Sequence, residues 1–390
     1  MYIIPLLIKQ PTWGGKYIAQ YKKIQDEETL AANIGQAYEL AQDSLLIDEP
    51  IDLKPGDQLP YQLAEATDLE HPHWFGKKYR TISMPDLIKK NVKDILGEKV
   101  AAKMNNQMAV LNKFTQAQEN SYQVHVQPDQ TFEQWQPKPE SWYFFEQGKA
   151  TLGLKTNANV LAYQNRCTEI YEYSQELSRQ VREGELDVAA AREKLEKFIN
   201  HDHPRHYVNT LELKAGQIVD LSEGGIHHSW EADANFPKGN IVYEVQLDQR
   251  DDVSSIRAFD QGKIKDDGSV RQLAIEAYFK ALNINADANL PDQYLQSHDS
   301  FQDDDGLITH LFDCEHYRLT MIEFDKNYGG LETQLDDEFH HLFVKEGEVE
   351  VRYDGRRWLV PAGWSIFIPA GCQQYQLSST APAVVLKTTA

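Results

Sequence analysis

Short stretches of alternating apolar and polar residues, separated by Gly and Pro turns, occupy both ends of this 390-residue chain. The clearest is HLFVKEGEVEVRYDGRRWLVPAGWSIFIPAG, residues 341–371. Alternation with period two predicts half-buried β-strands, and closely spaced turns indicate a sandwich or barrel. A second β-rich region precedes residue 265, and helical patterns separate the two. The sequence therefore predicts a mainly β protein built twice on one plan, with helical insertions.

Three regions are expected along the chain. Residues 1–265 form the first, with helical segments at about 64–118 and 174–203, the latter predicted as a solvated insertion packed on a sheet. Residues 266–305 are expected to be a helix and a linker rich in Asp, Asn and Gln. Residues 306–390 form a C-terminal β-region.

The charge balance limits the partners. Sixty Asp and Glu against 39 Lys and Arg give a formal net charge of −21. An acidic chain repels phosphate backbones and anionic membranes, so we expect neither nucleic acid nor membrane as a partner. A small anionic substrate is still compatible with a local group of Lys and Arg. The opening MYIIPLLI lacks basic residues and reads as a strand, and no apolar run reaches the roughly 18 residues of a membrane helix.

The cysteines indicate the compartment. Cys167, Cys314 and Cys372 are odd in number and far apart, which predicts neither a disulfide framework nor a Cys-type zinc site. A reducing, cytoplasmic location is therefore expected.

One turn pattern occurs twice. A Gly is followed by five residues, Pro or Ser, any residue, Gly, two residues and a polar residue. The copies run from Gly216 to His227 and from Gly363 to Gln374. This spacing resembles the second motif of the cupin barrels, which ends in a metal-binding His. The resemblance implies two cupin-type jelly-roll barrels, of which only the first, with His227, binds metal.

The segment SYQVH places Gln123 and His125 on one face of a predicted strand, because side chains two residues apart share a face. KPESWYF and GGIHHS follow in the chain. This order resembles the type I mannose-6-phosphate isomerases, a zinc-dependent cupin family, over most of residues 1–265. The resemblance implies Gln123, His125, Glu140 and His227 as metal ligands. The spacing from Gly216 selects His227 over His228.

The chemistry of this set agrees with the resemblance. Two imidazoles, a carboxylate and an amide suit zinc, with open positions for water or substrate. The same donors accept manganese, iron, cobalt or nickel, so zinc is the expected ion but not the sole candidate. Taken singly, a Gln-x-His pair is more often a solvent-facing polar stripe. The cluster HDHPRH at 201–206 is a rival metal signal, interpreted as a polar loop.

The resemblance also implies a reaction, the interconversion of mannose 6-phosphate and fructose 6-phosphate through an enediolate. Lys138 matches the position of a base, and Arg257 that of an active-site Arg which neutralises charge. Glu244 is expected either as a further acid/base group or as a residue that orients the pocket. Ser121 and Lys263 are expected to bind the phosphate.

Two alternatives stay open. The chain is a non-catalytic cupin that binds a sugar or sugar phosphate, or an isomerase for a different sugar phosphate. The segment from Glu244 to Arg257 is longer than the family pattern and favours these alternatives. A monomer and a homodimer are both compatible with the sequence.

Overall fold

The computed structural model describes residues 1–49, 51, 53, 57–128, 130, 132, 134–230, 233–303, 306–325 and 328–390. Most of its elements are strands, which form five sheets within these residues. The mainly β prediction is therefore confirmed. None of the sheets among the described strands closes on itself, so the two cupin-type barrels remain an interpretation.

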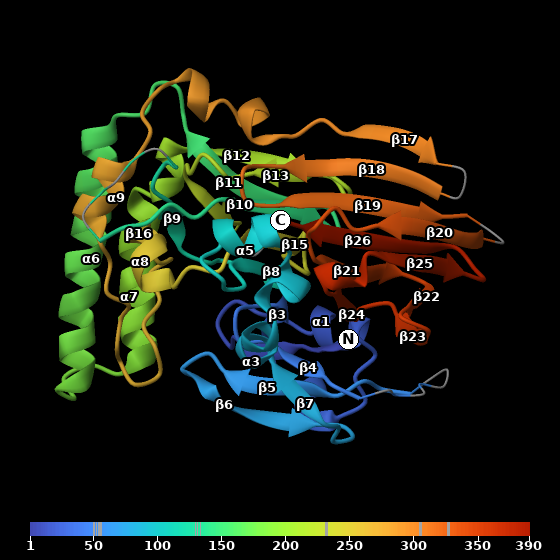
Figure 1. Ribbon diagram of the computed structural model, residues 1–390. Helices are drawn as coiled ribbons and strands as arrows, with labels where there is room; N and C mark the ends of the chain where they lie inside the picture. The colour runs from blue at the N-terminus through green and yellow to red at the C-terminus, as the bar shows by residue number, and fades with distance from the viewer. Residues whose placement is uncertain are drawn as a thin grey trace.

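An eight-stranded sheet crosses the centre of the molecule (Figure 1). Its order is β13-β10-β15-β8-β3-β2-β5-β6, and all its neighbours are antiparallel except β2 and β5. Strand β8 is buried along its whole length, which is typical of a central strand covered on both faces. The strands are β2 (Leu6–Lys9), β3 (Ile34–Leu40), β5 (Tyr61–Glu65), β6 (Asp68–Phe75), β8 (Val110–Ala117), β10 (Glu140–Phe144), β13 (Ile218–Asp220) and β15 (Asn240–Leu247).

A five-stranded antiparallel sheet, in the order β12-β11-β14-β9-β16, packs on one side of this central sheet. Trp142 and Phe144 of β10 share a small core with Ala150 and Leu152 of the second sheet. The first β-region is thus a two-sheet sandwich. The strands of the second sheet are β9 (Tyr122–Val124), β11 (Gly148–Leu154), β12 (Val208–Leu213), β14 (His227–Ser229) and β16 (Ile256–Phe259).

Three helices cover the outer face of the five-stranded sheet. They are α6 (Val160–Arg182), α7 (Val188–His201) and α9 (Ile275–Ala281), which stand together at the left of Figure 1. Tyr163 and Leu195 of the helices share a core with Tyr122 and Phe259 of the strands. The helical segment expected at 174–203 is a pair that begins earlier and breaks at Gly184, whose φ is +77°. No helix in the described part of the chain is long and apolar enough to cross a membrane.

The helical segment expected at about 64–118 is wrong at both ends. Helices occupy only its middle, as α3 (Met84–Lys90), α4 (Val92–Leu96) and α5 (Glu98–Lys103). The end of β5, β6 and a short strand at Thr81–Ser83 precede them, and β8 follows. All residues of β8 are buried, yet its sequence, VLNKFTQA, lacks the alternation of apolar and polar residues that marks a half-buried strand. Pairing of β8 with β3 and β15 decided the outcome.

Short elements complete the N-terminal part. A three-stranded sheet has the order β1-β4-β7, and two one-turn helices lie between β2 and β3. These elements are β1 (Ile3–Ile4), β4 (Leu45–Ile47), β7 (Thr81–Ser83), α1 (Tyr17–Tyr21) and α2 (Glu27–Ala31).

The C-terminal region contains a six-stranded sheet, β17-β18-β19-β26-β21-β24, and a four-stranded sheet, β20-β25-β22-β23. The end of the expected linker forms strand β17, which pairs with β18. Residues 304–305, between the two strands, lie outside the described residues. The strands are β17 (Asp299–Asp303), β18 (Gly306–Asp313), β19 (Arg318–Phe324), β20 (Tyr328–Gln334), β21 (His340–Glu346), β22 (Glu348–Tyr353), β23 (Arg356–Pro361), β24 (Ser365–Ile368), β25 (Gln374–Ser379) and β26 (Ala383–Thr389).

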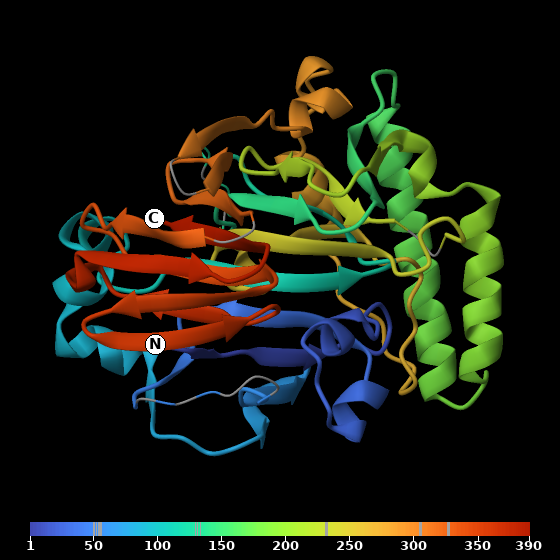
Figure 2. The same cartoon turned by 90° about the vertical axis from the view of Figure 1, so that its right-hand side faces the viewer.

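The two β-regions share one hydrophobic core. Phe114 of β8 packs against Phe343 of β21, with ring centroids 5.7 Å apart, and both belong to a cluster that spans the central sheet and the C-terminal sheets. Figure 2 shows the C-terminal strands on one side of the central sheet and the helical pair on the other.

Candidate metal centre and its cavity

The sandwich of the first β-region brings His125, Glu140 and His227 together. The three side chains are buried, and their ligand atoms lie within 4.8 Å of one another. His125 directly follows β9, while Glu140 and His227 open β10 and β14. Gln123 stands opposite His227 in the register of β9 and β14, so the two side chains share a face.

Backbone carbonyls fix the orientation of both imidazoles. Nδ1 of His125 lies 2.7 Å from the carbonyl oxygen of Ser254, and Nδ1 of His227 lies 3.0 Å from that of Gly225. A carbonyl only accepts, so each Nδ1 carries the proton and each Nε2 keeps a lone pair. Both Nε2 atoms are buried without a hydrogen-bond partner. Leaving such an atom unsatisfied costs about 1–3 kcal/mol, which a bound ion would offset.

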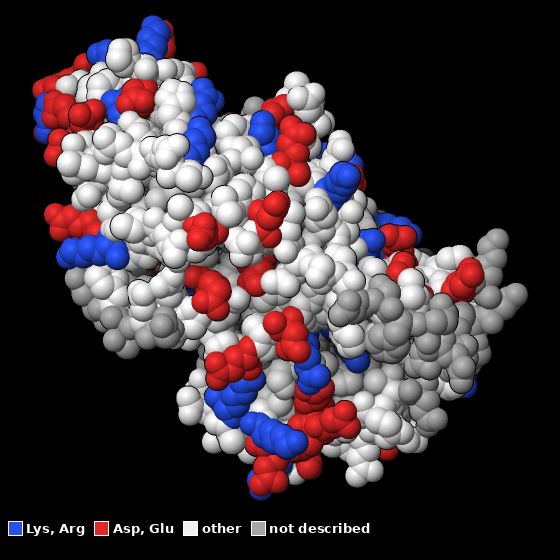
Figure 3. Space-filling model, turned by 90° about the horizontal axis from the view of Figure 1, so that it is seen from above, with Lys and Arg blue, Asp and Glu red and all other residues white. Residues whose placement is uncertain are grey.

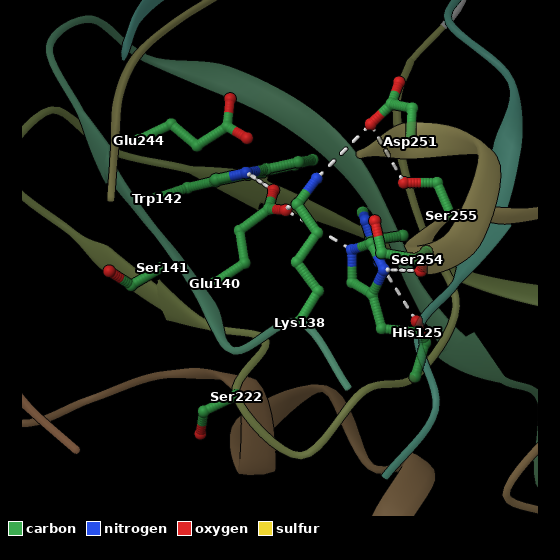
Figure 4. A network of polar contacts seen from close by, with 12 residues as sticks. His125, Lys138, Glu140, Ser141, Trp142, Ser222, Glu244, Asp251, Ser254 and Ser255 are labelled. Carbon is green, nitrogen blue, oxygen red and sulfur yellow. Dashed lines mark hydrogen bonds and ion pairs between the residues drawn. The ribbon is translucent and has the colours of Figure 1, made fainter. Parts of the chain in front are cut away.

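Glu140 completes the group as a carboxylate. Its Oε2 lies 3.3 Å from Nε2 of His125 and 3.7 Å from the Lys138 ammonium, and its Oε1 accepts a hydrogen bond from the Trp142 indole. Burial alone would raise the pKa of Glu140, but the Lys138 ammonium holds that pKa well below its usual range. Figure 4 shows Lys138, Glu140 and His125 pointing toward one another, while Ser141 points away.

The protonation states suit a metal ion. Burial, together with the neighbouring His125, lowers the pKa of His227 to about 3, so its imidazole is neutral near pH 7. Two imidazole nitrogens with open lone pairs and one carboxylate form a donor set that fits zinc and related divalent ions. These residues could therefore hold a divalent metal. The part of Gln123 as a fourth ligand stays a prediction, since its amide is half-buried at the rim of this group.

A cavity of about 180 Å³ opens beside the metal group, between the two sheets. Seven of the nine residues predicted from the sequence line it, namely Ser121, Gln123, Lys138, Glu140, Glu244, Arg257 and Lys263. The other two, His125 and His227, do not line the cavity but lie next to Glu140, which does. The structure thus gathers residues from 121 to 263 around a single cavity.

Glu244 lies on β15, facing the cavity. Its Oε1 is 2.7 Å from the Lys113 ammonium, and its Oε2 accepts a hydrogen bond of 3.2 Å from the Thr115 hydroxyl. Burial and the nearby Glu140 carboxylate raise the pKa of Glu244 to about 7, although Lys113 opposes the shift. A carboxyl that titrates near neutrality can both accept and return a proton.

The extended segment before Arg257 contributes a residue that the sequence did not single out. It forms helix α8 (Asp251–Ser254), and the Asp251 carboxylate lies 3.5 Å from the Lys138 ammonium and 2.9 Å from the Arg257 guanidinium. Arg257 also donates a hydrogen bond of 3.0 Å to the Ser121 hydroxyl. Ser121 therefore holds Arg257 in place here. The unusual length of the segment was the one signal that could have indicated Asp251.

The cavity is more basic than the rest of the chain. Its lining holds six Lys and Arg against four Asp and Glu, in a protein of net charge −21. On the outer face shown in Figure 3, acidic and basic side chains are interspersed. Sequence reasoning missed three of the cations, Lys113, Lys265 and Arg271. A concave site with excess positive charge suits a small anionic ligand.

The rival histidine cluster at 201–206 spans the end of α7 and the short 3-10 helix Pro204–Tyr207. It does not form a group with metal-ligand spacing within the described residues. The interpretation of this segment as a polar loop is wrong in its secondary structure, because the residues end α7 and form the 3-10 helix.

Solved structures share this fold. The chain matches mannose 6-phosphate isomerase from Bacillus subtilis with 13% identity and a TM-score of 0.65, over 100% of this chain and 98% of that one. It matches the isomerase from Salmonella typhimurium bound to fructose 6-phosphate and zinc with 13% identity and a TM-score of 0.62, over 99% and 98%. A putative mannosephosphate isomerase from Archaeoglobus fulgidus matches with 15% identity and a TM-score of 0.59, over 99% and 97%.

Comparisons of sequence give no match. No family model fits the chain, and no curated protein matches it. At these identities the structural likeness shows the fold, and the chemistry has to be argued from the residues of this chain.

Proposed function

We propose that this protein is a metal-dependent aldose–ketose isomerase that interconverts mannose 6-phosphate and fructose 6-phosphate. The observation that carries the proposal is the pair of buried Nε2 atoms, on His125 and His227, that flank the ionised Glu140 and have no hydrogen-bond partner. They lie beside a cavity that combines a carboxyl of pKa about 7, Glu244, with an excess of cations. Solved isomerases of the same fold include one bound to fructose 6-phosphate and zinc.

The proposed ion is zinc, held by His125, Glu140, His227 and Gln123. It would stabilise the negative charge that develops on the substrate oxygens as the proton moves between C1 and C2. We interpret the two β-regions as cupin-type jelly rolls, supported by their shared turn geometry.

Side chains that line the cavity would transfer the proton and bind the substrate. Glu244 takes the proton from one carbon and returns it to the next, because its carboxyl titrates near neutrality. Lys138 lies between Glu140 and Asp251, where its ammonium offers donors to substrate oxygens. Arg257, held by Ser121 and Asp251, neutralises charge on the substrate. Lys263 lines the same cavity and binds the phosphate.

One observation favours a binding protein instead. Asp251 lies against both Lys138 and Arg257, so an anionic substrate competes with a carboxylate that the chain supplies itself. In a non-catalytic protein these contacts would tune affinity for a sugar phosphate without any need to free the two cations for proton transfer.

A coupled assay separates the two functions. Purified protein is incubated with mannose 6-phosphate, and fructose 6-phosphate is measured before chelation, after chelation and after readdition of zinc, manganese or cobalt. The isomerase predicts turnover that is lost with the metal and restored with it. Metal-loaded protein that binds mannose 6-phosphate in calorimetry without converting it would establish the binding protein. A panel of glucose 6-phosphate and ribose 5-phosphate tests an isomerase for another sugar.

A further inference from the structure

His228 follows His227 on β14 and points to the opposite face of the sheet, because successive strand residues alternate. It is completely buried, with the Tyr122 ring 4.3 Å away. Its Nδ1 lies 2.9 Å from the Thr151 hydroxyl and its Nε2 lies 2.7 Å from the Gln261 amide nitrogen. An amide nitrogen only donates, so Nε2 accepts from Gln261 and Nδ1 donates to Thr151.

Gln261 belongs to a tight turn that follows β16. Its φ is +55°, and that of Gly262 is +66°. The left-handed conformation costs a residue other than glycine about 1–2 kcal/mol. The hydrogen bond to His228 gives this residue a fixed partner inside the core, which offsets that cost.

The turn carries charged groups into the cavity. Asp260 and Lys263 both line it, and the Lys263 ammonium donates to the backbone carbonyl of Glu119. Farther along the same segment, Lys265 and Arg271 also line the cavity, and Arg271 lies 3.0 Å from Asp260. The position of the turn therefore sets where four charges of the cavity lie.

Helix α7 holds the segment from the other side. A Cβ on Gly262 would lie 2.4 Å from Cδ1 of Ile199, so the backbone packs directly on the helix, and a larger residue there would have to displace the Ile199 side chain. Arg192 donates a hydrogen bond of 2.8 Å to the carbonyl of Ile264. The turn is thus held between His228 in the sheet and α7 outside it.

We infer that His228 is a positioning residue which, through Gln261, fixes segment 260–271 and so places its three cavity cations, Lys263, Lys265 and Arg271, as the site for the phosphate monoester of the substrate. The inference rests on the proposed function and adds that two neighbouring histidines of β14 have different roles. His227 points to the metal side of β14, and His228 anchors the anion-binding segment from the core side. Neither Gln261 nor His228 touches the substrate.

Gln261→Leu tests the inference, because it removes the amide donor and nearly preserves volume in a half-exposed turn. We expect KM for mannose 6-phosphate to rise about tenfold, the equivalent of one lost hydrogen bond, with kcat within about twofold. The dissociation constant of inorganic phosphate, measured by calorimetry, should rise by a similar factor, and the metal content should stay unchanged. Gln272→Leu is the matched control, an exposed glutamine of the same loop outside the lining, and should change neither quantity.

His228→Phe serves as a second variant, since it keeps a ring against Tyr122 and removes both hydrogen bonds. The same selective loss of phosphate affinity in both variants supports the inference. Unchanged phosphate affinity in folded Gln261→Leu overturns it, as does the absence of phosphate binding by the wild-type protein. If the wild-type protein binds phosphate but does not turn over mannose 6-phosphate, the isomerase proposal fails, and phosphate affinity in the variants still decides this inference.

Discussion

The two β-regions contain the same turn, in the same backbone geometry. Gly216 and Gly363 both have φ of +86°, and their N–H groups donate to the carbonyls of Phe144 and Val344 at 2.8 Å in each case. The register of the strands that follow is also shared. Leu221 donates to the carbonyl of Glu140, and its counterpart Ile368 pairs with His340. His340 thus occupies in the C-terminal region the place of Glu140.

The remaining places correspond as well. Gln374 takes the place of His227, and it stands opposite Gln334 just as His227 stands opposite Gln123. The two glutamines are exposed and hydrogen-bond to each other at 3.2 Å. His340 is buried, but its Nδ1 lies 2.9 Å from the Tyr375 hydroxyl.

The difference shows what makes a metal site out of this turn. Both regions share the backbone register of the turn and of the strands around it. In the first region the three residues of the metal group are buried, and Ser254 of α8 supplies the carbonyl that orients His125. In the second the two glutamines are exposed and hydrogen-bond to each other, and the buried His340 contacts the Tyr375 hydroxyl. Within the described residues, metal-ligand spacing of His, Cys and carboxylate groups is found in the first region.

The largest effect is expected when His227 of the first region is replaced by glutamine, the residue that the second region has at the corresponding position. His227→Gln should remove the bound metal and reduce turnover by about 10³-fold, because a ligand is lost beside a buried carboxylate. Metal analysis of the purified protein and the coupled assay measure both. The reciprocal change, Gln374→His, should leave the metal content unchanged. A second equivalent of bound ion in that variant would show that residue identity, rather than burial, separates the two regions.

Glu244→Gln should reduce kcat by about 10²- to 10⁴-fold, the usual contribution of a general base, with the metal content unchanged. In the wild-type protein the rate should fall as the pH drops below about 7, because the pKa of Glu244 is raised to about 7 and protonation removes the base. The residual rate of the variant should not follow this limb. An acid limb that persists in Glu244→Gln would assign the base to another group.

The metal-free protein should lose stability in mild acid. Burial lowers the pKa of His227 to about 3, so the unfolded chain takes up the proton first, from pH 6.5 downward. The contribution is fully present above pH 6.5 and is lost as the pH falls toward 3. Between pH 6.5 and 5.5 one such histidine accounts for about 1 kcal/mol of unfolding free energy. Urea titrations at pH 6.5 and 5.5 give the unfolding free energy of the chelated wild-type protein and of His227→Asn. The loss of unfolding free energy between the two pH values should be about 1 kcal/mol larger in the wild-type protein, and equal losses would contradict the assignment.

The smallest effect concerns how the second region supports the first. Tyr317, in the C-terminal hairpin between β18 and β19, donates a hydrogen bond of 2.8 Å to the carbonyl of Val245, and its hydroxyl oxygen lies 3.2 Å from the Ser141 hydroxyl. Its hydroxyl thus joins the strands that carry Glu140 and Glu244. Tyr317→Phe should lower the unfolding free energy by about 1 kcal/mol. Tyr173→Phe on α6 controls for loss of a hydroxyl, and equal stability losses in the two variants would remove the special role of Tyr317.

The sequence indicated which residues lie together around the cavity more accurately than it indicated the secondary structure. Period-two alternation and the Gly-turn spacing were sufficient to group Gln123 with His125 and to prefer His227 over His228. The misreading of β8 as helix concealed Lys113, which lies on a strand with no polar face to mark it. Asp251 and Gln261 were missed because their partners are distant in the chain, and no local pattern reports such contacts.

The sequence by itself determined the local geometry: which neighbours share a strand face, and where glycine permits a left-handed turn. The tertiary structure decided the chemistry. Which ring nitrogen of His125 and His227 remains free depends on carbonyls of Ser254 and Gly225, and the ionisation of Glu140 and Glu244 depends on burial and on Lys138 and Lys113. Protonation and hydrogen bonding respond to the surroundings in space, and those surroundings exist only once the two sheets have packed together.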